Sequence, residues 1–211
     1  MYIPEHFQVT SEKDLHALIV SHPLGIIVTN GPQGMDANHI PFELEAGQGP
    51  KGTLHGHVAR ANPVWREVRD GDDVLVIFRA EHAYISPNWY PSKQENHKSV
   101  PTWNYSVVHV RGRIAVRDDE RYVRGVVAKL THHHEASQPQ PWKMTDAPKD
   151  YIAAMVKAIV GIEIEITDIA GKFKLSQNRE MRDSAGVADN LARQGDEALA
   201  QAVLTASRRE N

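Results

Sequence analysis

The chain has 211 residues, 41% of them hydrophobic, and a formal net charge of −3 from 24 basic and 27 acidic side chains. This hydrophobic share excludes an intrinsically disordered chain, and no apolar run approaches the ~20 residues of a membrane-spanning helix. The sequence has no cysteine, which excludes disulfides, thiolate zinc ligands and a cysteine nucleophile. Since Met1 to His6 also lack the pattern of a signal peptide, we expect a cytoplasmic protein that does not associate with membranes.

The charge balance also bears on nucleic acids. A dedicated DNA-binding domain usually carries a basic excess, because phosphate neutralisation supplies most of its affinity. Acidic residues outnumber basic ones here, which argues against direct DNA binding. The twelve histidines are the unusual feature of the composition, because histidine can ligate a metal, carry a proton or donate a hydrogen bond to phosphate.

Hydrophobic periodicity and turn residues predict strands interspersed with helices. For example, Leu15, Leu18 and Ile19 have helical spacing and follow Ser11, a candidate N-cap. The expected elements, in chain order, are a helix over 11–21, strands over 24–29, 35–44 and 53–59, a short helix over 63–68, a strand over 73–80 that 82–86 continues or pairs with, a loop over 87–101, a strand over 102–116, a helix over 119–130, a polar connection over 132–148, a helix over 150–158, a strand over 160–166, a lysine-rich loop over 171–182 and one or two helices over 186–208.

Six or seven strands in a meander, with helices between and after them, predict a small antiparallel β-barrel with flanking helices. The fold class is therefore α+β and mainly β. No repeat and no clear linker divides the sequence, so we expect a single domain over 1–211 with a C-terminal helical segment at about 186–211.

A candidate anion site lies where the strand over 53–59 meets the next helix. His55 and His57 are two residues apart, so they project to the same face of the sheet. Arg60 follows at the strand exit, beside the free N–H groups of a helix that Asn62 is placed to cap. The alternative is a capped helix start with two surface histidines.

A second candidate is the segment Asn38-His39-Ile40-Pro41-Phe42. Pro41 removes a hydrogen-bond donor, which favours an edge strand or a bulge. An amide, an imidazole and free backbone groups there can bind the edge of a flat heterocycle. A strand that simply ends in a bulge is the alternative, and the segment alone favours it.

Two loops carry further candidates. The aromatic stretches Tyr84–Lys93 and Val100–Tyr105 suit either stacking on a planar ligand or, more typically, a subunit interface. The segment Gly171–Arg179 holds three cations with amides and a hydroxyl, which suits an anion or a nucleic-acid backbone, although a solvated loop is the simpler interpretation. The run His132–His134 has no metal-ligand spacing and is interpreted as a surface run.

Six ordered motifs resemble the PaiB family, whose members are described as FMN-binding negative transcriptional regulators. The resemblance extends from Met1 to about Asn190. The motifs are Met1-Tyr2-Ile3-Pro4 with His6-Phe7, Asn38-His39-Ile40-Pro41-Phe42, Gly56-His57-Val58-Ala59-Arg60-Ala61-Asn62-Pro63, Tyr84-Ile85-Ser86-Pro87 with Trp89-Tyr90, Val100-Pro101-Thr102-Trp103-Asn104-Tyr105, and Lys172-Phe173-Lys174-Leu175-Ser176-Gln177-Asn178.

This resemblance implies an FMN-binding split barrel, similar to pyridoxamine-phosphate-oxidase-like proteins, that forms a homodimer with flavin sites at the subunit interface. By analogy with that fold, the phosphate lies near the segment His57–Asn62, with Arg60 as its main ligand, and the isoalloxazine lies along Asn38–Pro41. The implied FMN-binding residues are Asn38, His39, Ile40, His57, Val58, Arg60, Asn62, Lys93, Trp103, Asn104 and Lys174, of which Lys93 and Lys174 are candidate second cations.

Three functions remain open from the sequence. The first is a flavin-binding negative transcriptional regulator. The second is an FMN-dependent oxidoreductase of a small substrate, in which the flavin carries the hydride. The third is a haem-binding or haem-degrading split-barrel protein, with an axial nitrogen from His6, His39, His109 or the run His132–His134. No metal site and no catalytic residue is assigned.

Overall fold

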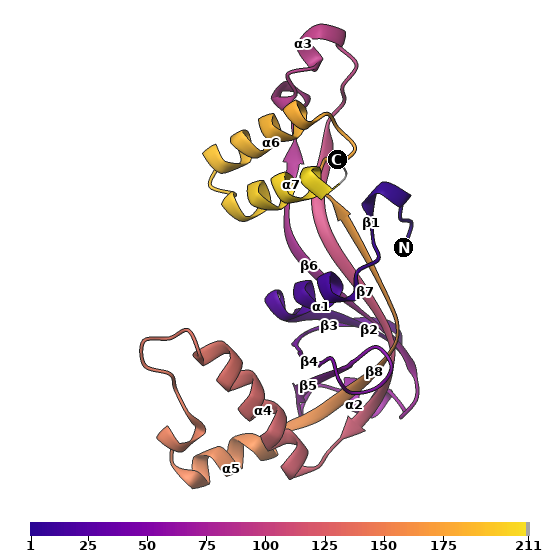
Figure 1. Cartoon of the computed structure of the whole chain (residues 1–211). Helices are drawn as coiled ribbons and strands as arrows, with labels where there is room; N and C mark the ends of the chain where they lie inside the picture. Colours follow the sequence, from indigo (N-terminus) through magenta and orange to yellow (C-terminus); the bar gives the residue numbers. More distant parts are fainter. Residues whose placement is uncertain (210–211) are drawn as a thin grey trace. The chain divides into compact units, whose positions relative to one another are not determined.

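The structure is a computed structural model that describes residues 1–209, so the last two residues of the expected C-terminal helical segment lie outside it. Within this range the strands form one antiparallel sheet in the order β3-β2-β6-β7-β8-β5-β4, and β1 pairs with β8 (Figure 1). The strands are β1 (Gln8–Val9), β2 (Leu24–Gly31), β3 (Gly34–Pro41), β4 (Glu43–Glu45), β5 (Thr53–Ala59), β6 (Asp73–Ile85), β7 (Thr102–Arg117) and β8 (Ile159–Lys174).

Seven α-helices and three short 3-10 helices accompany the sheet in residues 1–209. The α-helices are α1 (Glu12–Ser21), α2 (Val64–Glu67), α3 (Lys93–Asn96), α4 (Glu120–Glu135), α5 (Lys149–Lys157), α6 (Met181–Arg193) and α7 (Glu197–Arg209), and the 3-10 helices are η1 (Glu5–Phe7), η2 (Pro87–Trp89) and η3 (Met144–Asp146). Of the helices formed by these residues, none combines the length and apolar character that a membrane crossing requires.

The chain folds into two compact units. The terminal unit comprises Met1–Leu18, Arg79–Val108 and the chain from Ala170 onward, and the barrel unit comprises Ile19–Phe78 and His109–Ile169. Strands β6, β7 and β8 contribute residues to both units.

In the barrel unit, the two end strands of the sheet are not joined by a strand ladder, and packed side chains fill the gap between them. Strands β3 and β4 are the two ends of the strand order. Ile40 lies near the end of β3, and Phe42 follows that strand. Both side chains are buried and pack over Gly56 of β5, where an added Cβ would lie 3.1–3.2 Å from their atoms. The barrel is therefore split, which confirms the expected mainly-β α+β fold of the split-barrel type.

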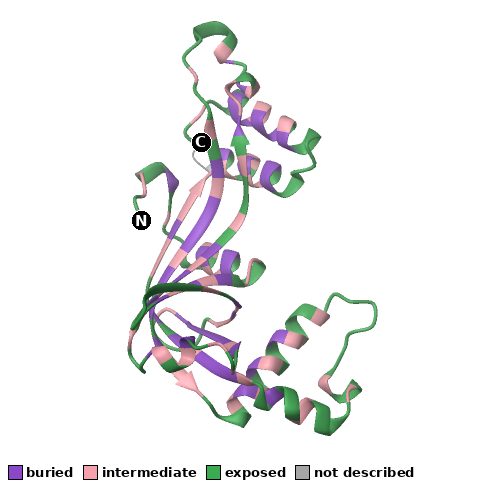
Figure 2. Ribbon diagram, turned by 180° about the vertical axis from the view of Figure 1, so that it is seen from behind, coloured by how far each residue is buried: buried purple, intermediate pink, exposed green. Residues whose placement is uncertain are grey.

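Helix α4 packs on the outer face of this barrel. Val123, Val126 and Leu130 are its buried positions, with helical spacing, as Figure 2 shows along the helix. The ring of Tyr122 lies against Gly161 of β8, where a Cβ would come within 2.5 Å of it. A residue without a side chain at 161 is thus needed for α4 to dock.

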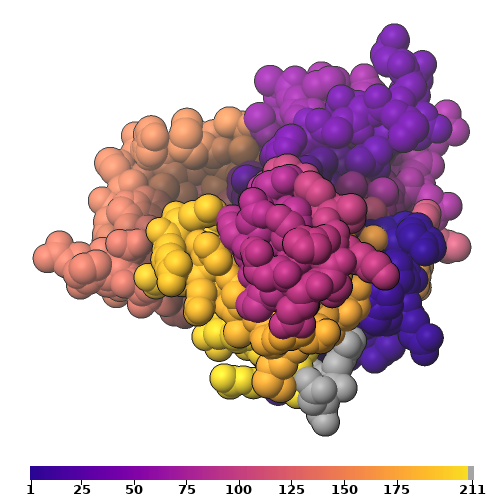
Figure 3. All heavy atoms as spheres, turned by 90° about the horizontal axis from the view of Figure 1, so that it is seen from above, coloured from indigo at the N-terminus to yellow at the C-terminus, as the bar shows by residue number. Residues whose placement is uncertain are grey.

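The terminal unit has its own core. Helices α6 and α7 form a helical hairpin with Gly195 in its turn. The φ of Gly195 is 89°, a conformation that favours glycine. Buried positions on both helices, such as Leu191 and Val203, pack with Ile85 and Tyr90. In Figure 3 the segment that holds η2 and α3 lies beside α6. Asp183 of α6 is buried and fixes this contact, because it accepts hydrogen bonds from the amide of Ser92 at 3.0 Å and from its hydroxyl at 2.6 Å.

The structure corrects several expected elements. The strand over 35–44 is interrupted at Phe42, and 82–86 largely continues β6 to Ile85. The helix over 119–130 extends to Glu135, because the next proline is Pro139 and histidines in the last turn suit the helix C-terminus. The lysine-rich loop begins later than expected, because β1 pairs with residues 171 and 172 and β8 continues to Lys174. Helix α6 begins at Met181 rather than at 186.

Candidate functional site

The predicted site residues fall into two groups. Seven of them surround β3 and the end of β5 in the barrel unit, and we call them the strand-edge cluster: Asn38, His39, Ile40, His57, Val58, Arg60 and Asn62. The other four lie in the terminal unit, and Asn104 and Lys174 line a cavity there.

In the strand-edge cluster, Asn62 connects α2 to β3. The predicted cap at Asn62 is wrong by one residue, because the N-cap of α2 is Pro63. Asn62 precedes this cap; its Oδ1 accepts from the amide of Val64 at 2.9 Å, and its Nδ2 donates to Asn38 Oδ1 at 2.7 Å. His39 is exposed on β3, which pairs with β2 along one edge and ends the strand order on the other. The other edge of β3 thus leaves backbone groups free to bind the rim of a heterocycle.

Two members of the cluster can act only through their backbones. Ile40 and Val58 have buried side chains that belong to the barrel core. His57 is half-buried, and its Nδ1 is buried without a hydrogen-bond partner among residues 1–209. Burial lowers the pKa of His57 from its ordinary value of 6.5, which favours the neutral ring.

Arg60 uses four of its five N–H donors on its own chain. Its two terminal nitrogens donate to the Asp118 carboxylate at 2.8 and 2.5 Å, and its Nε donates to the carbonyl of Lys157 at 2.7 Å. Its second terminal nitrogen also lies 3.2 Å from the carbonyl oxygen of Ile159. The hydrogen bonds between the pair raise the pKa of Arg60 and lower that of Asp118. A phosphate at this position would share the guanidinium with Asp118 or displace it.

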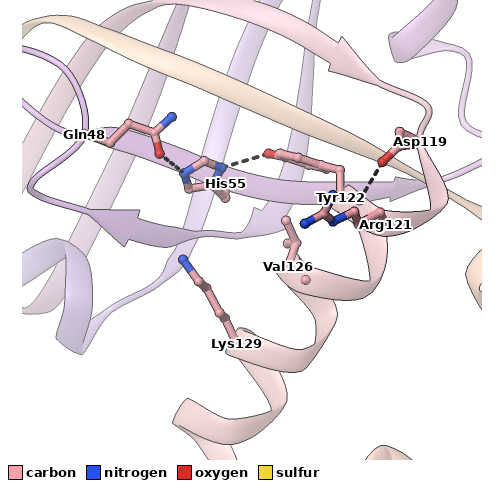
Figure 4. Close-up of a pocket in the computed structure, with 8 residues that line it drawn as sticks. Gln48, His55, Asp119, Arg121, Tyr122, Val126 and Lys129 are labelled. Atoms are coloured by element: carbon pink, nitrogen blue, oxygen red, sulfur yellow. Dashed lines mark hydrogen bonds between the residues drawn. The ribbon is translucent and has the colours of Figure 1, made fainter.

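A cavity of about 350 Å³ lies between β5 and α4 (Figure 4). His55 reaches into it, and both ring nitrogens have partners: Nδ1 lies 2.8 Å from the Tyr122 hydroxyl and Nε2 lies 3.2 Å from Gln48 Oε1. The same hydroxyl donates to the carbonyl of Ile162 at 3.0 Å. The cavity is lined by Gln48, His55, Asp119, Arg121, Tyr122, Gly125, Val126 and Lys129.

The groups around this cavity favour a structural role. Burial lowers the pKa of His55, in spite of the nearby Glu163 carboxylate, and burial raises the pKa of Tyr122 above its ordinary value. Both groups therefore favour their neutral forms. Since the Tyr122 hydroxyl donates to Ile162, a neutral His55 donates from Nδ1 to that hydroxyl, and these two bonds hold α4 on the barrel. Among the described residues, neither of the two buried side-chain atoms without a hydrogen-bond partner, His57 Nδ1 and Tyr90 Oη, belongs to a residue that lines this cavity.

The terminal unit holds a smaller cavity of about 130 Å³, which we call the cationic pocket. Lys174 Nζ donates to Thr102 Oγ1 and, at 2.6 Å, to the carbonyl of Trp103. The guanidinium carbon of Arg179 lies 4.9 Å from the centre of the Tyr90 ring. The pocket is lined by Phe7, Tyr90, Thr102, Asn104, Lys174, Ser176, Asn178 and Arg179.

The polar groups of the cationic pocket are unusual in three ways. Tyr90 is 1% exposed, and its buried hydroxyl lies beside the side chains of Ser176 and Arg179 without a hydrogen bond of good geometry within residues 1–209. Asn104 and Ser176 are also buried, and the Asn104 amide lies 2.9 Å from the Ser176 hydroxyl. Ser176 has a φ of 65°, a left-handed conformation that costs energy for a residue with a side chain.

Two of the predicted residues do not enter this pocket with their side chains. Trp103 contributes its carbonyl, while its ring is 53% exposed. Lys93 donates to Asn88 Oδ1 at 2.5 Å and is not among the lining residues. Tyr90 and Arg179 line the pocket but were not predicted as ligands, although both belong to segments that the sequence marks as aromatic or cationic.

Comparison with known proteins identifies the family. Residues 1–168 match the family described as "Putative FMN-binding domain". The chain belongs to this FMN-binding family. It is also 32% identical over 192 residues to the protease synthase and sporulation protein PAI 2 of Bacillus subtilis, which covers 90% of this chain and 89% of that protein. The expected PaiB-type family and its cofactor FMN are thereby confirmed.

Solved structures show the same fold at low identity. A conserved hypothetical protein of Mycobacterium tuberculosis is 12% identical with a TM-score of 0.59, and the match covers 85% of this chain and 94% of that one. The FAD and heme binding protein of Mycobacterium smegmatis is 17% identical with a TM-score of 0.57, over 79% of this chain and 73% of that one.

Proposed function

We propose that this protein is an FMN-binding homodimer that acts as a negative regulator of gene expression. The observation that carries the regulatory role is the 32% identity to the Bacillus subtilis protein over about nine-tenths of both chains, because the name of that protein refers to protease synthase and sporulation. The flavin role rests on the family match over residues 1–168.

The residues present fit a flavin. The free edge of β3 offers backbone donors and acceptors to the isoalloxazine rim, next to His39 and to Asn38, which Asn62 holds in place. Within the terminal unit, taken by itself, the cations Lys174 and Arg179 of the cationic pocket fit an anionic group. When bound, FMN supplies electron or hydride transfer, and the chain contributes binding and orientation.

An exposed aromatic patch supports the homodimer. The Trp103 ring stacks on His82 with ring centres 6.1 Å apart and meets Tyr84 edge-on at the same separation. Trp103 and Tyr84 are both exposed. Large aromatic side chains that water still reaches are typical anchors of subunit interfaces. We assign this patch to contact with a second copy of the chain.

We further propose that regulation acts through a protein partner or the flavin state rather than through DNA contact. Helices α6 and α7 are the nearest equivalent of a helix-turn-helix, but acidic Asp183, Asp189 and Glu197 accompany their basic residues. The net charge of −3 also gives no electrostatic attraction to phosphate.

The test is the visible absorbance spectrum of the purified protein, before and after addition of FMN. A bound flavin spectrum with one FMN per chain supports the proposal, and a protein that takes up no FMN contradicts it. Bleaching by NADH or NADPH, with reoxidation on turnover of a small substrate, would instead favour an FMN-dependent oxidoreductase. A Soret band after addition of hemin would favour haem chemistry. Binding to promoter fragments at low salt would contradict the indirect mode of regulation.

A further inference from the structure

The cationic pocket holds positive charge that no acidic side chain balances. Among the described residues, Lys172, Lys174 and Arg179 have no carboxylate within 4 Å. The nearest acidic residue on α6, Asp183, is already bound by Ser92. Burial and the charges of Lys172 and Arg179 lower the pKa of Lys174, which shows that the cations crowd one another. Such a cluster is stabilised when an anion binds between its members.

Hydrogen-bond donors are aimed into the same space. The Tyr90 hydroxyl is buried at the cavity beside Ser176 and Arg179, and it makes no hydrogen bond of good geometry there within residues 1–209, which costs free energy for a buried hydroxyl. Asn104 uses part of its amide on Ser176, and an amide nitrogen carries two N–H donors, so a second donor is still available. An oxyanion accepts from all of these groups at once, whereas a neutral apolar ligand would leave them unsatisfied.

The size of the cavity limits the ligand. Its volume of about 130 Å³ is well below the ~300 Å³ or more of pockets that enclose whole small molecules. It accommodates a tetrahedral oxyanion but not a three-ring flavin nucleus. The ligand therefore inserts one charged group and keeps its remainder outside.

We propose that the cationic pocket binds the phosphate group of a phosphate monoester, with Lys174 and Arg179 as its cations and Tyr90 and Asn104 as its hydrogen-bond donors. Either FMN itself or a second phosphorylated ligand can supply this group. In the first case the inference rests on the proposed function, and in the second it is independent of it. In both cases the phosphate ligands come from the terminal unit and do not include Arg60, whose guanidinium pairs with Asp118 in the barrel unit.

The experiment measures three affinities by isothermal titration calorimetry on the full-length, flavin-free protein at constant ionic strength: inorganic phosphate, FMN and riboflavin, which lacks the phosphate. The variants are Lys174→Gln, Arg179→Gln and Tyr90→Phe. Lys149→Gln, which changes a lysine at the start of α5, is the matched control. Thermal unfolding confirms that each variant is folded. Tyr90→Phe keeps the ring that packs in the core and removes only the hydroxyl.

We expect Lys174→Gln to weaken phosphate binding at least ~10-fold, the usual loss for a charge-assisted hydrogen bond, and Tyr90→Phe to weaken it several-fold. Lys149→Gln should bind as the wild type does. If phosphate competes with FMN, and Lys174→Gln removes the preference for FMN over riboflavin, the bound group is the flavin's own phosphate. If phosphate binds equally well to FMN-saturated protein, a second phosphorylated ligand uses the pocket.

The inference is overturned if folded Lys174→Gln and Tyr90→Phe bind phosphate and FMN as the wild type does, or if the wild type binds no phosphate and does not distinguish FMN from riboflavin. Its failure is distinguishable from failure of the proposed function. A protein that binds phosphate through Lys174 but takes up no flavin contradicts the FMN proposal alone. A protein that binds FMN but loses nothing in Lys174→Gln contradicts the phosphate site alone.

Discussion

The guanidinium of Arg60 faces the carboxylate of Asp118 with two hydrogen bonds of 2.8 and 2.5 Å, and the two residues are 58 positions apart in sequence. The same guanidinium binds the carbonyl of Lys157, just before β8 begins. Arg60 thus joins the end of β5, the end of β7 and the start of β8 within the barrel unit. This use of its donors differs from the phosphate contact that the resemblance implies.

The first prediction concerns this pair. We expect Arg60→Gln to lower the melting temperature and to leave the ratio of FMN to riboflavin affinity unchanged, because the side chain holds three strands rather than a ligand. Asp118→Asn should lower the melting temperature as well, since it removes the same ion pair. Fluorescence titration of both flavins with each variant checks this. A tenfold loss of FMN affinity in Arg60→Gln alone would return Arg60 to the phosphate site.

The second prediction concerns the contact of α4 with the barrel. Tyr122→Phe removes a hydroxyl that lies 2.8 Å from His55 Nδ1 and donates to the carbonyl of Ile162. We expect the free energy of unfolding in urea to fall by about 1–3 kcal/mol, because a part-buried imidazole and a carbonyl lose their partner. Tyr151→Phe on α5, where the ring is exposed, is the control and should change little.

The third prediction is that the protein loses stability as the pH falls below about 6.5. Burial lowers the pKa values of His55, His57 and His109 in the folded state. Between each lowered pKa and about 6.5 the unfolded chain binds protons that the folded chain does not, so stability rises with pH in this window and is fully present above it. Urea unfolding between about pH 5 and about pH 8 measures the slope.

A single variant measures how much of this pH dependence of stability comes from His57. His57→Gln should reduce the slope, because a glutamine does not titrate and its amide can still occupy the half-buried position. An unchanged slope would mean that His57 titrates alike in the folded and unfolded states. The exposed His134, changed to Gln, is the matched control.

The fourth prediction tests the subunit interface. Trp103→Ala should convert the proposed homodimer to monomers in sedimentation velocity, because it removes the largest exposed side chain of the aromatic patch. The melting temperature of the monomer should change little, since the ring is already 53% exposed. Trp142→Ala, at the other well-exposed tryptophan, should leave the dimer intact. A dimer that survives Trp103→Ala places the interface elsewhere.

The fifth prediction compares two helical glycines. A Cβ at Gly186 of α6 would lie 2.3 Å from the carbonyl oxygen of Trp89, so Gly186→Ala should destabilise the terminal unit by about 1–3 kcal/mol. Nothing lies within 4 Å of a Cβ at Gly125 of α4, so Gly125→Ala should stabilise the protein by about 0.5–1 kcal/mol. Urea unfolding of both variants measures the difference, and equal effects would contradict the packing of α6 on η2.

Local patterns in the sequence were sufficient for most elements. The strand over 53–59 agrees with β5 at both ends, and the helix over 11–21 agrees with α1 to within one residue, because period-two and period-3.6 patterns are properties of neighbouring residues. The side-chain bond of Asn62 to the start of α2 is also local, since its partner is only two residues away, although the N-cap itself is Pro63. The errors arose where a distant segment decided the outcome. Strand β8 continues to Lys174 because β1, more than 160 residues earlier in the chain, pairs with it.

The sequence by itself determined the family, the mainly-β class and the residue types of the site, because ordered motifs and hydrophobic periodicity are carried by short stretches of chain. Only the tertiary structure decided which of those residues act together. Asn104 and Ser176 are 72 positions apart, and the pocket also needs Tyr90 and Arg179 from two further segments. Likewise, the pairing of Arg60 with Asp118 joins residues 58 positions apart. Such groupings depend on pairwise distances in the folded chain, which charge and spacing along the sequence do not encode.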